Sequence, residues 1–227
     1  MDTGKILTYL TDLEQNNNRE WYHAHKVEYQ QANTEFEALI TALILSVGQT
    51  DSHILHNNPK ELTFKLVRDT RFSKDKSPYN PAFRAHISSA GKLPIPVGYY
   101  ICIRPGDCSF IGGGLFASMF KDATTMVRDH ISANGAEFQR IISDKAFQDS
   151  FTVMGEALKN VPTEYEKEHE QALYLKYKSW YLEYPMPDSL IADPDRFVKL
   201  ATEKFVLMQP FNAFLNTALR DFTMPER

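Results

Sequence analysis

The spacing of apolar residues changes twice along this chain, and that change constrains the fold more than any other feature. From Ile6 to Val47, apolar residues recur every three or four positions, as in helices with one buried face. They alternate with polar residues in three short runs, 83–88, 97–104 and 108–111, which predicts antiparallel strands. Helical spacing then returns. The pattern predicts an α+β fold, with a central, mainly antiparallel sheet flanked by N-terminal and C-terminal helices.

Several helix boundaries can be placed from the sequence. Asn18 is expected to cap a long helix that starts at Arg19 and ends at Gly48. Near the C-terminal end of the sequence, two helices are expected, with a break before Pro210 because proline lacks the amide hydrogen that a helix interior needs.

Length and composition favour one compact domain. A chain of 227 residues, of which 43% are hydrophobic, can bury roughly 70% of its unfolded surface without metal or disulfide support. The sequence has no linker, low-complexity tract or internal repeat. We therefore expect a single domain over 1–227, with a helical part (1–50), a motif loop and sheet (60–116) and a helical and mixed part (117–227).

The overall charge and the cysteines point to a cytoplasmic protein. A net charge of −4 does not fit a broadly polybasic nucleic-acid binder, although a local basic groove is compatible with it. Cys102 and Cys108 flank a short turn and are expected to be reduced thiols. No secretory signal is visible, and the longest apolar run, 38–47, is about half of what a membrane span needs. No membrane association is expected.

The segment 65–79 concentrates positive charge in this acidic chain. It holds five cations and two carboxylates, and therefore carries a charge of +3. The cations are Lys65, Arg68, Arg71, Lys74 and Lys76, and the carboxylates are Asp69 and Asp75. Guanidinium groups match phosphate oxygens two at a time, and lysines add point charges. Pro78 stiffens the backbone before Tyr79.

Three interpretations of this segment are open. It can bind an anion, its ions can pair with one another and pin a surface loop, or it can be a solvated charged face with little energetic weight. Asp69 and Asp75 could orient the cations, hold a substrate hydroxyl or bind a divalent metal. The sequence alone does not separate these roles.

A glycine triplet, Gly112-Gly113-Gly114, follows the third predicted strand. Its amides can face an anion without obstruction by side chains, but a bulge or close packing between strands explains the triplet equally well. The lysine and hydroxyl residue that complete a phosphate-binding P-loop are missing.

The sequence contains no complete catalytic signature. The histidine pairs His23/His25 and His53/His56 lack the spacing of metal ligands, so no metal site is predicted. The serine hydrolase elbow and the zinc protease motif are absent. Catalytic residues and cofactors therefore stay unknown.

The cationic segment resembles the signature of an uncharacterised, mostly bacterial family, domain of unknown function 2461. The family pattern is Arg-x-x-Arg-Asp-x-Arg-Phe-x-x-x-Asp/Asn-Lys-x-x-Tyr, which this chain matches at Arg68, Asp69, Arg71, Phe72, Asp75, Lys76 and Tyr79. Lys65 replaces the usual first arginine, and Thr163-Glu164-Tyr165 lacks the glycine common in relatives. The resemblance extends to 17–22 and 112–115. It implies a single-domain cytoplasmic protein and points to no particular activity.

We expect a phosphate-group binding site formed by Arg68, Asp69, Arg71, Asp75, Lys76 and Tyr79 with the glycine triplet 112–114. Its ligand would be a nucleotide or another phosphate-containing small molecule, and an enzyme acting on such a phosphoester is compatible with this site. A nucleic-acid binding module and a non-catalytic interaction protein with a structural ion-pair network are the alternatives.

Overall fold

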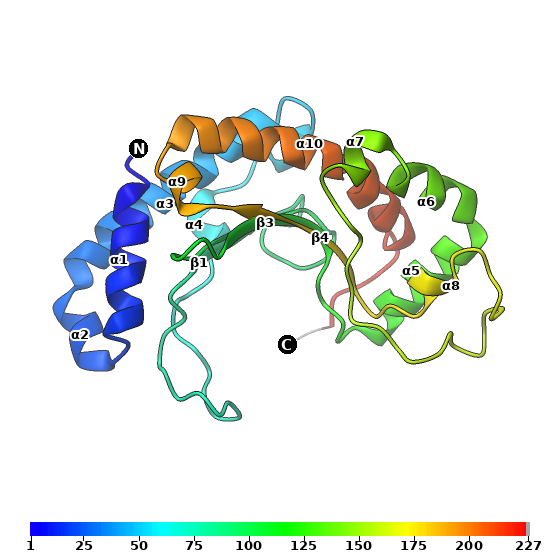
Figure 1. Cartoon of the computed structure of the whole chain (residues 1–227), viewed down its shortest axis with the longest axis horizontal. Helices are drawn as coiled ribbons and strands as arrows, with labels where there is room; N and C mark the ends of the chain where they lie inside the picture. The colour runs from blue at the N-terminus through cyan, green and yellow to red at the C-terminus, as the bar shows by residue number, and fades with distance from the viewer. Residues whose placement is uncertain (226–227) are drawn as a thin grey trace.

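The computed structural model describes residues 1–225 and has the α+β architecture expected from the sequence (Figure 1). Its elements, in chain order, are α1 (Gly4–Gln15), α2 (Arg19–Ala24), α3 (Lys26–Val47), η1 (Ser52–Ile54), α4 (Pro59–Leu62), β1 (Phe83–Ile87), β2 (Tyr99–Ile103), β3 (Ser109–Leu115), α5 (Lys121–Ala133), α6 (Gly135–Ile142), α7 (Lys145–Gln148), α8 (Ala172–Leu175), β4 (Trp180–Met186), α9 (Asp188–Ile191) and α10 (Pro194–Ala218).

The sheet forms an arch at the centre of the molecule. Its four strands run in the order β1-β2-β3-β4, and every neighbouring pair is antiparallel. The long helices α3 and α10 lie over the convex side, while α1 and α2 stand at one end and α5, α6 and α8 at the other (Figure 1). We call the side under α3 and α10 the closed face and the concave side the open face.

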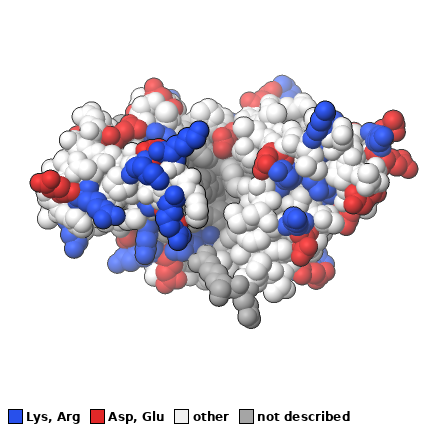
Figure 2. Space-filling view, turned by 90° about the horizontal axis from the view of Figure 1, so that it is seen from below, with Lys and Arg blue, Asp and Glu red and all other residues white. Residues whose placement is uncertain are grey.

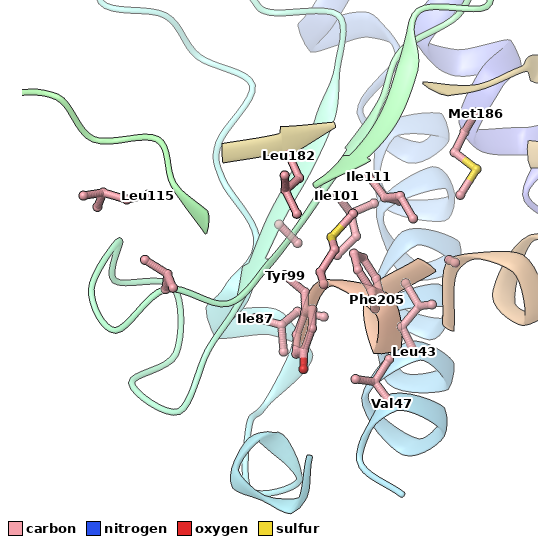
Figure 3. Packing of buried hydrophobic residues seen from close by; sticks show 14 of the residues in the cluster. Leu43, Val47, Ile87, Tyr99, Ile101, Ile111, Leu115, Leu182, Met186 and Phe205 are labelled. Carbon is pink, nitrogen blue, oxygen red and sulfur yellow. The ribbon is translucent and has the colours of Figure 1, made fainter. Parts of the chain in front are cut away.

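The closed face carries the centre of the hydrophobic core. Ile101, Ile111 and Leu182 are completely buried there, and they lie toward Leu43 of α3 and Phe205 of α10 (Figure 3). Tyr99 packs its ring 4.9 Å from that of Phe205. Because side chains alternate across a strand, the residues between these positions face the concave side.

The structure adds a strand that the sequence pattern did not indicate. β4 pairs with β3 along its whole length, from Trp180 opposite Leu115 to Met186 opposite Ser109. β4 contains Pro185, which is tolerated because β4 lies at the sheet edge. Pairing with β4 also extends β3 beyond the predicted end at Ile111, to Leu115.

Two predictions about the continuity of helices were wrong. The helix expected from Arg19 to Gly48 is divided at His25, where the backbone leaves helical geometry and the imidazole Nδ1 lies 2.8 Å from the Trp21 carbonyl. The Asn18 cap is confirmed, since its side chain accepts from the Trp21 amide at 2.9 Å. The expected break before Pro210 is absent: α10 continues through it, because buried apolar residues hold both halves against the core.

No helix among the described residues has the length and apolar character needed to cross a membrane.

Candidate functional site

The cationic segment folds as a hairpin, the cationic hairpin (residues 65–79), which projects from the β1 edge of the sheet (Figure 1). The Arg68 amide donates to the Pro78 carbonyl at 2.9 Å, and the Asn80 amide donates to the Leu66 carbonyl at 2.7 Å. Between them, Val67 bridges Tyr79 in antiparallel fashion. The tip is open to solvent, with Phe72 96% exposed.

Both arginines of the hairpin hold carboxylates of the same hairpin. Arg68 pairs with Asp75 and also donates to the Ser77 carbonyl at 3.3 Å. The Arg71 guanidinium contacts both oxygens of Asp69, with Nη2 at 2.6 Å from Oδ2. Arg71 is still 78% exposed. The structure therefore brings together four of the predicted site residues as two ion pairs.

These pairs keep the hairpin carboxylates ionised. Hydrogen bonds from the Ser77 hydroxyl and amide, with Arg68 beside them, hold the pKa of Asp75 well below its usual range. The Arg71 side chain and amide lower the pKa of Asp69 in the same way, and Asp69 in turn raises the pKa of Arg71. A lowered pKa makes each carboxylate a weaker proton acceptor than an ordinary aspartate.

The lysines carry the excess positive charge of the hairpin. Lys65 and Lys74 are exposed, and their ammonium groups have no hydrogen-bond or ion-pair partner within residues 1–225. The Lys76 ammonium donates to the Thr70 carbonyl at 2.9 Å, which does not neutralise it. With two arginine–carboxylate pairs internally balanced, the +3 charge resides on these three lysines.

Tyr79 anchors the base of the hairpin. It is 5% exposed and stacks on Tyr22 with ring centroids 4.1 Å apart. The Asn17 side chain accepts from the Tyr79 amide at 3.1 Å and donates to the Tyr79 carbonyl at 2.9 Å. Burial raises the pKa of Tyr22 to about 12. Tyr79 therefore fixes the base of the hairpin against the turn that joins α1 to α2.

The glycine triplet lies in the sheet and away from the hairpin. Gly112 and Gly113 pair with both β2 and β4, and Gly114 pairs with Tyr181 of β4. Gly114 has a φ of +96°, and a methyl group added there would lie 2.4 Å from the Trp180 carbonyl oxygen. Strand packing thus accounts for the triplet, and the part of the predicted site that stays together is the hairpin.

The open face carries a row of aromatic side chains that come from distant parts of the sequence. Ring centroids are 6.4 Å apart for Phe64 and Tyr100, 5.3 Å for Tyr100 and Phe116, and 4.5 Å for Phe116 and Tyr181. Phe110 lies 5.8 Å from Tyr100. All five are half-buried. We call this set the aromatic row. Figure 2 shows the molecule from below, where a hollow divides the visible surface into two parts.

The glycine at position 112 makes room for this row. A methyl group on Gly112 would lie 3.0 Å from the Phe116 ring and 2.6 Å from the Leu182 carbonyl oxygen. Gly113 faces the other way, where an added methyl would meet Met208 and Asn212 of α10 at 3.0 to 3.2 Å. The triplet therefore lets both faces of β3 be approached closely.

Charged groups accompany the aromatic row. Arg84 lies over the Phe64 ring at 5.7 Å and donates to the Lys65 carbonyl at 3.1 Å. Burial raises the pKa of Glu183, which faces the same side of β4. Burial also raises the pKa of the Cys102 thiol to about 11, and both cysteines are free, as expected. Such a thiol is a poor nucleophile at neutral pH.

Two cavities lie elsewhere in the molecule. One of about 400 Å³ is lined by residues of α1, α2 and α3, including Tyr9, Trp21 and Glu28. The other, of about 250 Å³, lies beside Tyr99 and Asn212. Neither borders the hairpin cations. Within residues 1–225, no three His, Cys, Asp or Glu side chains are grouped so that they could hold a metal ion.

Comparison with known proteins places the chain in a family. The model of a family described as conserved hypothetical protein (DUF2461) matches residues 5–214. No curated protein and no solved structure matches the chain significantly. Since the match spans nearly the whole chain, including α1, the hairpin, the sheet and most of α10, this protein belongs to the DUF2461 family.

Proposed function

We propose that this protein binds phosphate groups through its cationic hairpin. The observation that carries the proposal is the set of three exposed lysines, Lys65, Lys74 and Lys76, whose charge no carboxylate of the hairpin balances. An ammonium group in solvent attracts phosphate through charge without demanding a fixed geometry. The hairpin thus supplies a local positive field on an acidic protein.

Its surroundings favour access by a large anion. The hairpin projects from the sheet edge in Figure 1, and Figure 2 shows lysine and arginine side chains gathered beside the hollow. A projecting arm can lie along several phosphates in succession, whereas a small ligand would gain more from an enclosed pocket. We infer a ligand that carries more than one phosphate.

The paired arginines add a second layer of contacts. Arg71 and Asp69 are 78% and 57% exposed, and exposed ion pairs contribute little to stability. A phosphate can therefore draw Arg71 into a bidentate contact at small cost. Arg68 is 27% exposed and forms an ion pair with Asp75 and hydrogen bonds with Ser73 and Ser77. It therefore stabilises the conformation of the hairpin.

Titration calorimetry with inorganic tripolyphosphate tests the proposal, because this probe offers phosphates alone. The wild type is expected to bind, and the triple variant Lys65→Ala, Lys74→Ala, Lys76→Ala is expected to lose binding. Binding should weaken as the salt concentration rises, because salt screens the attraction between exposed charges.

A matched variant separates local from overall charge. Lys121, Lys159 and Lys167 are also exposed lysines, outside the hairpin, and their replacement by alanine removes the same net charge. Equal losses in both triple variants, or no binding by the wild type at low salt, would reject the hairpin as a phosphate site.

A further inference from the structure

The aromatic row gives the open face a repeated element. Phe64, Tyr100, Phe116 and Tyr181 follow one another across the sheet, with successive ring centroids 4.5 to 6.4 Å apart. Their counterparts on the closed face, such as Ile101 and Leu182, are completely buried. The four rings stay half-buried. The molecule thus presents aromatic surface on the side that the long helices leave uncovered.

The row is continuous with the cationic hairpin. Phe64 directly precedes Lys65, the first residue of the hairpin. Arg84 connects the two, since its guanidinium lies 5.7 Å from the Phe64 ring centroid and donates to the Lys65 carbonyl. Positive charge therefore stands at one end of the row, next to Phe64.

One class of ligand combines phosphates with a succession of flat rings. Bases of a single-stranded nucleic acid stack on aromatic side chains exposed on a sheet, while basic residues contact the backbone. A mononucleotide has one base and would use one ring, whereas the row runs from Phe64, beside β1, to Tyr181 of β4. In a duplex the bases are already stacked on one another and cannot lie on the rings.

The polar groups of this face suit base edges. Arg84 is half-buried and offers a guanidinium whose Nη2 donates to the Lys65 carbonyl, while its Nε is buried and has no hydrogen-bond partner within residues 1–225. Glu183, directly opposite Gly112 in the sheet, offers a carboxyl group beside the rings. Carboxylates accept hydrogen bonds from exocyclic amino groups, and arginine donates to base carbonyl and ring nitrogen atoms.

We propose that the open face binds a single-stranded nucleic acid, with its bases on the aromatic row and its backbone along the cationic hairpin. This inference rests on the proposed phosphate binding by the hairpin and adds to it the class of ligand. Two observations favour a single-stranded nucleic acid as the ligand of the open face: the positive charge of the hairpin and the position of Arg84 between the hairpin and the rings.

Fluorescence anisotropy with a short labelled oligothymidine tests the inference. The control ligand is an abasic strand of the same length and phosphate number, which lacks only the bases. Stacking on one ring contributes about tenfold or more in affinity, so the abasic strand is expected to bind far more weakly. Tyr100→Leu and Tyr181→Leu, which keep an apolar side chain, should each weaken oligothymidine binding about tenfold.

Tyr165→Leu is the control variant. Tyr165 is likewise half-buried but donates to Asp129 of α5 at 2.7 Å, away from the row, and its replacement should leave the affinity unchanged. Near-UV circular dichroism checks that every variant is folded.

The outcomes separate the two proposals. Equal affinity for the abasic strand and oligothymidine, or for single strand and duplex, would overturn base stacking and leave phosphate binding by the hairpin intact. Failure to bind either strand, with tripolyphosphate also unbound, would overturn both proposals.

Discussion

The two faces of the sheet are made by the same strands but use them differently. On β3, Ile111 points to the closed face and is completely buried, whereas its neighbour Phe110 points to the open face and is half-buried. On β4, Leu182 and Tyr181 show the same contrast. Strand alternation therefore produces one face that holds the molecule together and one that offers rings to the outside.

The difference between the two faces indicates which substitutions should change stability and which should change binding. Substitutions on the closed face remove packed volume, and their cost appears in the free energy of unfolding. Substitutions on the open face remove less buried area and should appear mainly in binding. The predictions below test this division, from the largest expected effect to the smallest.

The sharpest test compares two adjacent residues of β3. Ile111→Ala should lower the free energy of unfolding by about 2 to 5 kcal/mol, since it creates a cavity among fully buried side chains. Phe110→Ala should cost about 1 kcal/mol, because the ring is only half-buried. Urea unfolding measures both values. Similar losses in the two variants would mean that the open face is part of the core.

Acid should weaken the fold at one end of the open face. His86 of β1 is 6% exposed, and burial lowers its pKa to about 4 from the ordinary 6.5, with the Lys92 and Leu93 backbone offsetting part of the effect. The unfolded chain thus binds a proton that the folded protein excludes. Stability should fall as pH drops from 6.5 to 4, by about 3 kcal/mol from this group.

The variant His86→Gln isolates this contribution, because glutamine does not titrate. Its free energy of unfolding should depend less steeply on pH between 6.5 and 4 than that of the wild type. His56 is exposed, and His56→Gln should keep the wild-type slope. An unchanged slope for His86→Gln would show that the His86 ring takes up a proton as readily in the folded protein as in the unfolded chain.

Local patterns predicted most of the fold and missed what depends on distant pairing. Alternation between residues 83 and 111 indicated three strands. The Asn18 cap was predictable because its side-chain oxygen accepts from the amide of Trp21, only three residues later. β4 depends on β3, which lies more than sixty residues earlier in the chain. Likewise, α10 passes through Pro210 because of core contacts that no local propensity describes.

The candidate site was predictable in composition but not in arrangement. Charge density marked residues 65–79, yet sequence could not tell that Arg68 and Arg71 hold Asp75 and Asp69 while the lysines stay unpaired. The aromatic row joins residues from 64 to 181, so it exists only after the strands pair. A signal was present: Tyr100, Phe110 and Tyr181 occupy the alternate positions that face away from the core.

The base of the hairpin should tolerate less change than its tip. Asn17→Ala removes both hydrogen bonds to the Tyr79 backbone, which should cost about 1 to 2 kcal/mol. Hydrogen exchange of the Tyr79 amide should accelerate accordingly. Asn16→Ala is the matched control, because Asn16 donates only to the exposed Asp12 carbonyl. If both variants exchange alike, the Asn17 contacts do not hold the hairpin.

The smallest effect on stability is expected at the tip. Arg71→Ala removes a guanidinium that is 78% exposed and that, within residues 1–225, forms an ion pair with Asp69 of its own hairpin alone. The melting temperature should therefore stay at the wild-type value. Binding of tripolyphosphate should nevertheless weaken, since Arg71 is free to exchange partners. Thermal unfolding with and without tripolyphosphate measures both effects. A lower melting temperature without ligand, combined with unchanged binding of tripolyphosphate, would instead assign the hairpin charges to a structural network. The reason is that removing one partner of an ion pair lowers stability when that pair supports the fold.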